Sequence, residues 1–263
     1  MLGTIVRTVR DGLTVHTYIA PAEGYEATTH LLEFATQLIV IDAQYDAGHA
    51  AEAFLHAQSL RKPITRVYVS HDHPDHWRGA ATFEAPIYSL AATRDSIAAA
   101  VQALAASADE GADEVPGREV VPERIVTVGD EVIDGVTVTF DDVRNAESAT
   151  LLVVSVESIG LVFAQDLVFN NLHMFIAEGN LQGWAEAISA FKARGFSVIL
   201  PGHGAPGGTE LYDYVLDYLA IAQPLLSSAA GPDELKNALI SAFPEAGGRG
   251  LLDIQNAIIF ADR

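Results

Sequence analysis

Residues 64–76 read ITRVYVSHDHPDH, an apolar run followed at once by three histidines and two aspartates. The run over 64–69 is rich in β-branched residues, which predicts a short buried strand. In an extended loop after this strand, alternate side chains lie on one side, and a turn at Pro74 brings the residues after it to the same place. The segment therefore predicts a metal site at the end of a strand. Its candidate ligands are His71, His73, Asp75 and His76.

The ligand types narrow the choice of metal. The chain contains no cysteine, which excludes disulfides, thiol catalysis, iron–sulfur clusters and thiolate zinc sites. Any metal must be held by imidazole and carboxylate groups, which suit zinc, iron or manganese. An ordinary polar loop would have to place three imidazoles and an acid at this spacing by accident, so we favour the metal site.

At these residues the sequence resembles the metallo-β-lactamase superfamily, whose signature is His-x-His-x-Asp-His after a strand. Two later segments are similar to further parts of that pattern. Residues 163–166, FAQD, look like the strand that ends in a metal-bridging aspartate, here Asp166. Residues 200–204, LPGHG, look like the segment of the last histidine ligand, here His203. The order and spacing of the motifs fit the family across residues 10–222.

The sequence departs from the family pattern at one ligand. Such proteins usually carry another histidine between the signature and the bridging aspartate, but no histidine occurs between His76 and His173. We expect Glu147 to ligate the metal in its place, a feature that resembles the alkylsulfatase branch of the family. The alternatives are that Glu147 is a solvated acid on a loop, or that Asn145 takes the position. Gln165 stands where that branch uses glutamate.

The resemblance implies a ligand set for two metal ions. One ion would be held by His71, His73 and Glu147, the other by Asp75, His76 and His203, with Asp166 bridging them. Asp42 resembles the family's acidic residue after an early strand, which braces the metal loop through hydrogen bonds. His173 follows Asp166 in the chain and is a candidate substrate contact, with a purely structural role as the alternative.

The activity implied by the resemblance is that of a metal-dependent hydrolase. Two divalent ions, zinc by expectation and iron or manganese as alternatives, would supply a metal-bridging hydroxide. That hydroxide would cleave an ester, lactone, amide or related bond of a small molecule, with Asp75 as the catalytic residue that carries a proton to the leaving group. Two other interpretations stay open. One is a mononuclear iron oxidoreductase of the same fold, and the other is a non-catalytic, degenerate relative.

The charge balance limits the partners. The chain carries 35 acidic and 15 basic residues, a formal net charge of −20, and its Lys and Arg residues form no clustered run. Nucleic acids and anionic membrane surfaces are therefore poor partners. No apolar run approaches the roughly 18 residues of a membrane span, and residues 1–9 do not resemble a signal peptide. We expect a cytoplasmic protein that acts on a small molecule.

Turn and cap signals divide the 263 residues into two halves of similar composition, each combining strands with helices. Asp134-Gly135 marks a hairpin in the second half. This pattern predicts an α/β fold, an αββα sandwich in which two mixed β-sheets pack face to face with helices on the outside. Strands are expected over 13–19, 30–41, 64–69, 86–90, 125–128, 131–133, 136–143, 150–156, 160–163 and 197–200. Helices are expected over 46–60, 93–106, 181–194 and 210–223, the last stopped by Pro224.

No segment reads as a linker between domains, so we expect one domain over 1–263. Residues 225–263 would form its C-terminal helical extension, with two helices around the Gly247-Gly248 break. These helices could pack on their own subunit or form a homodimer, and the pattern does not decide between the two. The acidic loop over 107–122 is a candidate lid.

Overall fold

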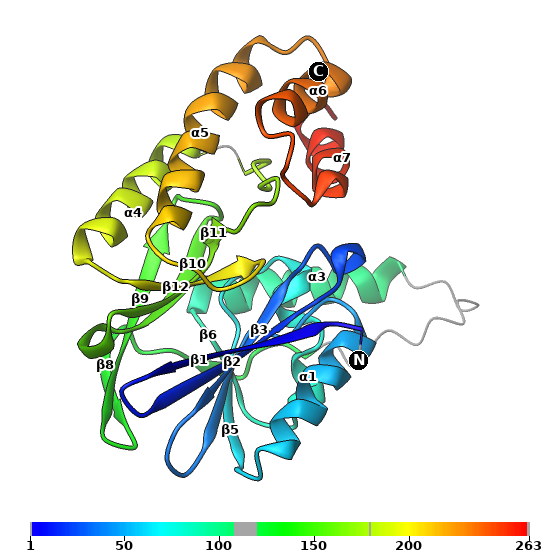
Figure 1. The fold of residues 1–263 in the computed structure, drawn as a ribbon. Coiled ribbons are helices and arrows are strands. Elements are labelled where there is room, and N and C mark those ends of the chain that lie inside the picture. Colours follow the sequence, from blue (N-terminus) through cyan, green and yellow to red (C-terminus); the bar gives the residue numbers. More distant parts are fainter. Residues whose placement is uncertain (1, 108–119, 179, 262–263) are drawn as a thin grey trace.

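The computed structural model describes residues 2–107, 120–178 and 180–261. In these residues two mixed β-sheets pack face to face, and helices cover both outer faces (Figure 1). The predicted αββα sandwich is therefore confirmed. Most of the candidate lid, residues 108–119, lies outside the described part of the chain.

The first sheet follows chain order from one edge to the other. Among the described residues its strands are β1 (Thr4–Arg10), β2 (Leu13–Ile19), β3 (Thr28–Glu33), β4 (Leu38–Ile41), β5 (Ile64–Tyr68), β6 (Ile87–Ser89) and β7 (Arg124–Ile125). Neighbours from β1 to β4 are antiparallel, and those from β4 to β7 are parallel. The carboxyl ends of β4 and β5 therefore lie at the same edge of the sheet.

The second sheet has the order β12-β11-β10-β9-β8. Its strands are β8 (Gly129–Ile133), β9 (Val136–Arg144), β10 (Thr150–Val156), β11 (Leu161–Phe169) and β12 (Val198–His203). Only the β11–β12 pair is parallel among these described strands. In the turn between β8 and β9, Asp134 and Gly135 have φ of 49° and 83°. A two-residue hairpin turn requires such values, so the predicted hairpin is confirmed.

Two pairs of helices cover the outer faces of the sheets. These are α1 (Ala47–Ser59) and α3 (Ala91–Ser107) on the first sheet, and α4 (Leu181–Arg194) and α5 (Glu210–Ser228) on the second (Figure 1). Asp46 caps α1 and Asn180 caps α4, because each side chain accepts backbone N–H groups of the first turn. No helix in the described residues is long and apolar enough to cross a membrane.

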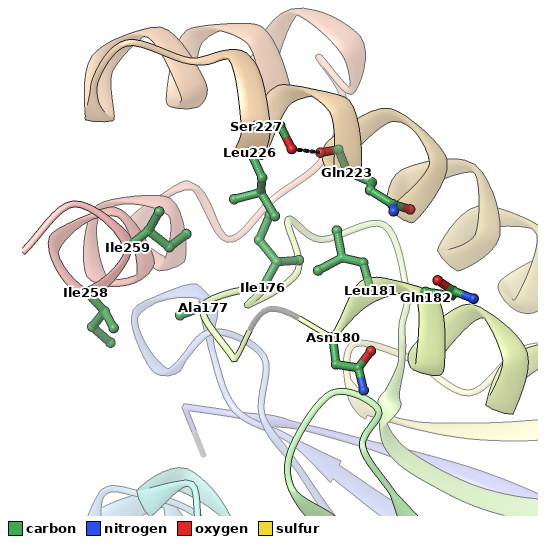
Figure 2. A pocket seen from close by; sticks show the side chains of 10 residues that line it. All are labelled: Ile176, Ala177, Asn180, Leu181, Gln182, Gln223, Leu226, Ser227, Ile258 and Ile259. Carbon is green, nitrogen blue, oxygen red and sulfur yellow. Dashed lines mark hydrogen bonds between the residues drawn. The ribbon is translucent and has the colours of Figure 1, made fainter. Parts of the chain in front are cut away.

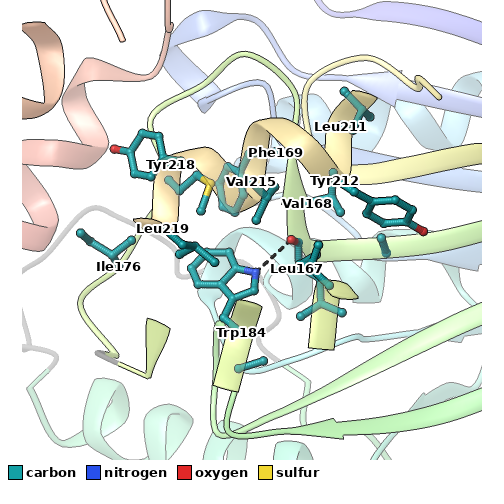
Figure 3. Packing of buried hydrophobic residues seen from close by; sticks show 14 of the residues in the cluster. Leu167, Val168, Phe169, Ile176, Trp184, Leu211, Tyr212, Val215, Tyr218 and Leu219 are labelled. Atoms are coloured by element: carbon teal, nitrogen blue, oxygen red, sulfur yellow. Dashed lines mark hydrogen bonds between the residues drawn. The ribbon is translucent and has the colours of Figure 1, made fainter. Parts of the chain in front are cut away.

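Apolar side chains fill the space inside the sandwich and beneath the helices. Between the sheets, Leu32 and Tyr68 of the first meet Phe140 and Phe163 of the second. Figure 3 shows the cluster between the second sheet and helices α4 and α5, where the indole N–H of Trp184 donates to a backbone carbonyl of β11 at 2.9 Å. This packing holds β11 and β12, which both lead to the candidate site, in fixed positions.

Two further helices, α6 (Pro232–Ala242) and α7 (Arg249–Ile259), pack beside the end of α5 (Figure 1). Leu235, Leu239 and Leu252 of these helices are buried in the same apolar cluster as α4, α5 and β11. The two predicted C-terminal helices are therefore present, and they share a core with the second sheet.

The linker between α6 and α7 also pairs with the segment after β11. Gly247 donates its N–H to the carbonyl of Asn171 at 2.9 Å, and its own carbonyl accepts the N–H of His173 at 2.9 Å. These bonds form an isolated β-bridge between Leu172 and Gly247. The C-terminal helices are thus tied by backbone hydrogen bonds to a loop that leaves the candidate site.

Two predicted boundaries are wrong. The expected strand over 30–41 is two strands, because the N–H of Phe34 donates to the carbonyl of Gln37 at 3.0 Å and closes a turn between them. Pro224 does not stop α5, which continues to Ser228. Leu225 and Leu226 pack against the apolar cluster beyond the proline, and this burial outweighs the backbone hydrogen bond that proline cannot make.

Other strands differ from prediction in extent or were not predicted. β1 is absent from the predicted strands, because it pairs on one side only and lacks a continuous buried face. β11 and β12 run past their predicted ends at residues 163 and 200 and continue to Phe169 and His203. The extra residues carry the polar groups of the site, so hydrophobic patterning does not reveal them as strand.

We expect Leu252→Ala to lower the free energy of unfolding by about 2–5 kcal/mol, because it removes a fully buried side chain from the shared cluster. Leu55→Ala on α1 is the matched control. Leu55 is 62% exposed, so its loss should change stability by less than about 0.5 kcal/mol. Urea denaturation followed by circular dichroism measures both. A loss confined to a separate, earlier transition would instead make the C-terminal helices an independent unit.

Candidate metal centre

All seven candidate ligands meet where strands of both sheets end. β5 leads directly into the hexapeptide 71–76, and its second half forms the short helix α2 (Pro74–Trp77). Glu147 lies in the loop between β9 and β10, Asp166 within β11, and His203 at the last position of β12. Because parallel strands deliver their carboxyl ends to one edge, residues far apart in sequence share one site.

Four of these residues form one group, the His71 group, consisting of His71, His73, Glu147 and Asp166. Their potential ligand atoms lie within 4.8 Å of one another. His73 Nδ1 is 3.3 Å from Glu147 Oε1, and His71 Nε2 is 3.8 Å from Glu147 Oε2. The side chains of His71, Glu147 and Asp166 are almost completely buried, while 18% of the His73 side chain is exposed.

The other three form the His203 group, consisting of Asp75, His76 and His203, whose potential ligand atoms also lie within 4.8 Å of one another. Asp75 Oδ2 is 3.4 Å from His203 Nε2. Asp166 reaches this group as well, because Oδ1 lies 3.1 Å from His76 Nε2 and Oδ2 lies 3.2 Å from His203 Nε2. Its carboxylate therefore stands between the two groups, in the position expected of a bridging ligand.

The polar atoms that face one another here fit a cation. Five of them are buried and have no hydrogen-bond partner among the described residues: His71 Nε2, His76 Nε2, both carboxylate oxygens of Glu147, and Asp166 Oδ1. Buried polar atoms without partners are rare and destabilising. Imidazole nitrogens and carboxylate oxygens aimed at one point are the donor set of a zinc, iron or manganese site.

Asp42, at the end of β4, holds ligands of both groups. It is fully buried and accepts the backbone N–H of Ser70 at 2.8 Å and the Ser70 hydroxyl at 2.7 Å. The Ser70 hydroxyl in turn accepts His71 Nδ1–H at 2.8 Å, and Asp42 accepts His76 Nδ1–H at 2.8 Å. Gln165 of β11 also donates its amide N–H to Asp42. The predicted bracing role of Asp42 is confirmed.

The loop that carries Glu147 is folded inward. Asn145 adopts a left-handed φ of 52° and donates its N–H to the carbonyl of Ala149 at 3.2 Å. This tight loop leaves Glu147 only 1% exposed, so Glu147 is not a solvated surface acid. The Asn145 residue is exposed, and it does not belong to either group of potential ligands.

An irregularity in β11 directs Asp166 into the site. The register between β11 and β12 shifts on both sides of Gln165, which has a left-handed φ of 47°. Gly202 of β12 makes this approach possible, because a Cβ there would lie 1.8 Å from Asp166 Oδ1. On the same strand, His203 Nδ1–H donates to the carbonyl of Tyr25 at 2.8 Å, which fixes the orientation of that ring.

These buried groups set one another's protonation. Burial lowers the pKa of His71 well below its usual range, and the neighbouring imidazoles lower it further. Burial opposes charge on His76, but Asp166 and Asp75 hold its pKa well above the usual range. Burial would raise the pKa of Asp166, yet the facing imidazoles hold it well below the usual range. Burial raises the pKa of Glu147. A metal ion must therefore displace protons from the cluster as it binds.

His173, the candidate substrate contact, lies outside both groups. It is fully buried, and its Nδ1 lies 3.2 Å from the Tyr218 hydroxyl. Two residues beside His73 were not predicted from the sequence. The Phe175 ring meets the His73 ring edge-on at a centroid distance of 5.2 Å, and Glu178 Oε1 lies 3.6 Å from His73 Nε2. Neither stands in a motif, so no sequence pattern could have identified them.

A hollow of about 640 Å³ lies between α4, α5 and α7 (Figure 2). Ile176, Ala177 and Asn180 line it from the segment between β11 and α4, and Ile258 lines it from α7. None of the seven candidate ligands is among its lining residues. The hollow borders the segment that carries Glu178, but it is separate from the two groups.

No protein-family model matches this sequence. Solved structures match its fold over most of the chain. The metallo-β-lactamase from Pontibacter korlensis is 19% identical with a TM-score of 0.64, and the match covers 82% of this chain and 99% of that one. The metallo-β-lactamase FIM-1 from Pseudomonas aeruginosa in its mono-zinc form is 20% identical with a TM-score of 0.63, and the match covers 85% of this chain and 97% of that one. The metallo-β-lactamase IND-7 is 18% identical with a TM-score of 0.67, and the match covers 83% of this chain and 98% of that one.

At these identities the likeness establishes the fold. The chain has the metallo-β-lactamase fold, so the predicted resemblance to that superfamily is confirmed at this level. The resemblance to the alkylsulfatase branch stays a prediction.

His30 of β3 generates a prediction about pH. It is fully buried, bonded to Thr17, Thr28 and the Pro201 carbonyl, and burial lowers its pKa to about 3. A depressed folded-state pKa gives stability that is present above about pH 6.5 and lost as pH falls toward 3. As the pH falls from 7 to 5, His30 should therefore lower the free energy of unfolding by about 2 kcal/mol.

Urea denaturation of the metal-free protein at several pH values measures this effect. His30→Gln removes the titrating group. Between pH 7 and 5, the free energy of unfolding of the variant should therefore fall by about 2 kcal/mol less than that of the wild type. An identical pH dependence in the two proteins would contradict the role of His30.

Proposed function

We propose that this chain is a metal-dependent hydrolase with a dinuclear site, acting on a small molecule. The observation that carries the proposal is the position of Asp166, whose two carboxylate oxygens approach imidazoles of both groups. The buried, unpartnered ligand atoms around it supply the remaining donors. His71, His73 and Glu147 would hold one ion, Asp75, His76 and His203 the other, and Asp166 would bridge them.

Bound divalent ions at such a site lower the pKa of water toward neutrality and polarise the bond to be cleaved. The residues of this chain contribute orientation and proton transfer. Asp42 fixes the ring of His76 directly, by a hydrogen bond of 2.8 Å, and the ring of His71 through the Ser70 hydroxyl, by hydrogen bonds of 2.7 and 2.8 Å. Asp75 is the ligand on the open side, with 20% of its side chain exposed, so it is suited to pass a proton to the leaving group.

The substrate we propose contains an ester, lactone, amide or related bond. Three solved structures of this fold are named metallo-β-lactamases, and one is described in a mono-zinc form, which supports hydrolysis and zinc. The formal net charge of −20 disfavours nucleic acids and other polyanions as substrates. A small molecule that reaches the exposed edges of His73 and Asp75 fits the enclosure of the other ligands.

Metal content tests the proposal directly. Protein purified without added metal should contain about two zinc ions per chain by plasma mass spectrometry. Asp166→Ala and Glu147→Ala should each lower that content, because each removes a ligand with no described substitute. Glu157→Ala, which changes an exposed acid paired with Arg194, is the control and should leave it unchanged. About one iron per chain would favour the oxidoreductase, and no metal would favour a degenerate relative.

The role of Asp75 has its own test. Asp75→Asn keeps the shape of the side chain but removes its charge and its ability to accept a proton. Hydrolysis of a panel of activated esters and lactones should fall by at least about 100-fold. Asp72→Asn is the matched control, because Asp72 stands in the same hexapeptide but belongs to neither group. Equal rates in the two variants would contradict a special role for Asp75.

A further inference from the structure

Each imidazole of the site has one ring nitrogen that faces the other ligands and one that faces outward. In His71, His76 and His203 the inner nitrogen is Nε2, and the outer Nδ1 donates a hydrogen bond. The acceptors are Ser70 Oγ, Asp42 Oδ2 and the carbonyl of Tyr25, each at 2.8 Å. These bonds fix both the orientation of the ring and the tautomer that leaves the inner nitrogen free for a metal.

His73 is turned the other way. Its Nδ1 faces Glu147 at 3.3 Å, so Nε2 is its outer nitrogen. That atom is buried and has no hydrogen-bond partner among the described residues. Oε1 of Glu178 lies 3.6 Å away, slightly beyond the length of a hydrogen bond. His73 therefore has an acceptor in place at its outer nitrogen, but the contact is looser than those of the other three rings.

Glu178 lies at the exposed side of this ring. With 44% of its side chain exposed to solvent, it has room to change rotamer. It belongs to the segment between β11 and α4, which also places the Phe175 ring edge-on against His73. Phe175 restricts the imidazole on one side, and Glu178 stands at its outer nitrogen. Together they enclose the most exposed imidazole of the site.

We propose that Glu178 is the positioning residue of His73, accepting the Nε2–H hydrogen bond that keeps Nδ1 directed at the metal of the His71 group. The proposal rests on the proposed function, because it assigns a partner to one of its ligands. It follows from the pattern of the other three rings, in which an oxygen acceptor holds each outer nitrogen. Glu178 would then be a carboxylate at the exposed end of the site that is positioned by a loop and not by a strand.

Two variants test the proposal. Glu178→Ala removes the acceptor, while Glu178→Gln removes the charge but keeps an oxygen that can accept the same N–H. Glu186→Ala on α4 is the matched control, since it deletes an exposed glutamate that accepts a hydrogen bond from Gln182 and belongs to neither group of potential ligands. Zinc affinity is measured by competition with a chromophoric chelator. The Nε2–H resonance of His73 is observed by NMR in metal-free and zinc-loaded protein and assigned with His73→Gln.

We expect Glu178→Ala to weaken zinc binding by about 10-fold and to move or exchange-broaden the His73 Nε2–H resonance. Glu178→Gln should restore most of both, and Glu186→Ala should change neither. Unchanged affinity and resonance in Glu178→Ala would overturn the proposal, as would equal losses in Glu186→Ala. A wild type that binds no zinc would count against the proposed function. The resonance of the metal-free protein would still decide whether Glu178 holds the His73 ring.

Discussion

The site depends first on one buried carboxylate, that of Asp42. A carboxyl group with no exposure to water needs hydrogen-bond partners, and Asp42 finds donors in Ser70, His76 and Gln165. The Ser70 hydroxyl accepts the Nδ1–H of His71, so the orientation of that ring also depends on Asp42. The donors come from the loop after β5, the helix α2 and the strand β11, so satisfying this carboxylate draws parts of both sheets together. The relative position of the two ligand groups is a consequence of that requirement.

Burial of the candidate ligands destabilises the folded state. The ligand cluster buries Glu147 and Asp166 beside several imidazoles, and six of its polar atoms lack hydrogen-bond partners among the described residues. The apolar clusters between and outside the sheets must supply the stability that holds it together. A cation bound at the proposed site would relieve the same cost, because it would satisfy these atoms only in the folded chain. Metal binding at this site would therefore be linked to folding.

Much of the site could be predicted from the sequence, because its ligands cluster in short motifs. The hexapeptide 71–76, residues 163–166 within β11 and the end of β12 each carry a local pattern. Glu147 could be predicted only as a replacement at the expected place, and its burial depends on a loop conformation that no pattern reveals. Glu178 and Phe175 could not be predicted, since their proximity to His73 arises from the path of a loop. In the fold, the length of α5 escaped prediction because packing beyond Pro224 outweighs local propensity.

The pairing of Gly247 with Asn171 and His173 has a consequence for how such a protein can diversify. It ties the C-terminal helices to the start of the same segment that, a few residues later, presents Phe175 and Glu178 to His73. The candidate ligands other than His73 are held by strand ends, by the loop between β9 and β10 and by Asp42. Substitutions in the C-terminal helices are therefore expected to act on the candidate site through this one segment, at its contacts with His73.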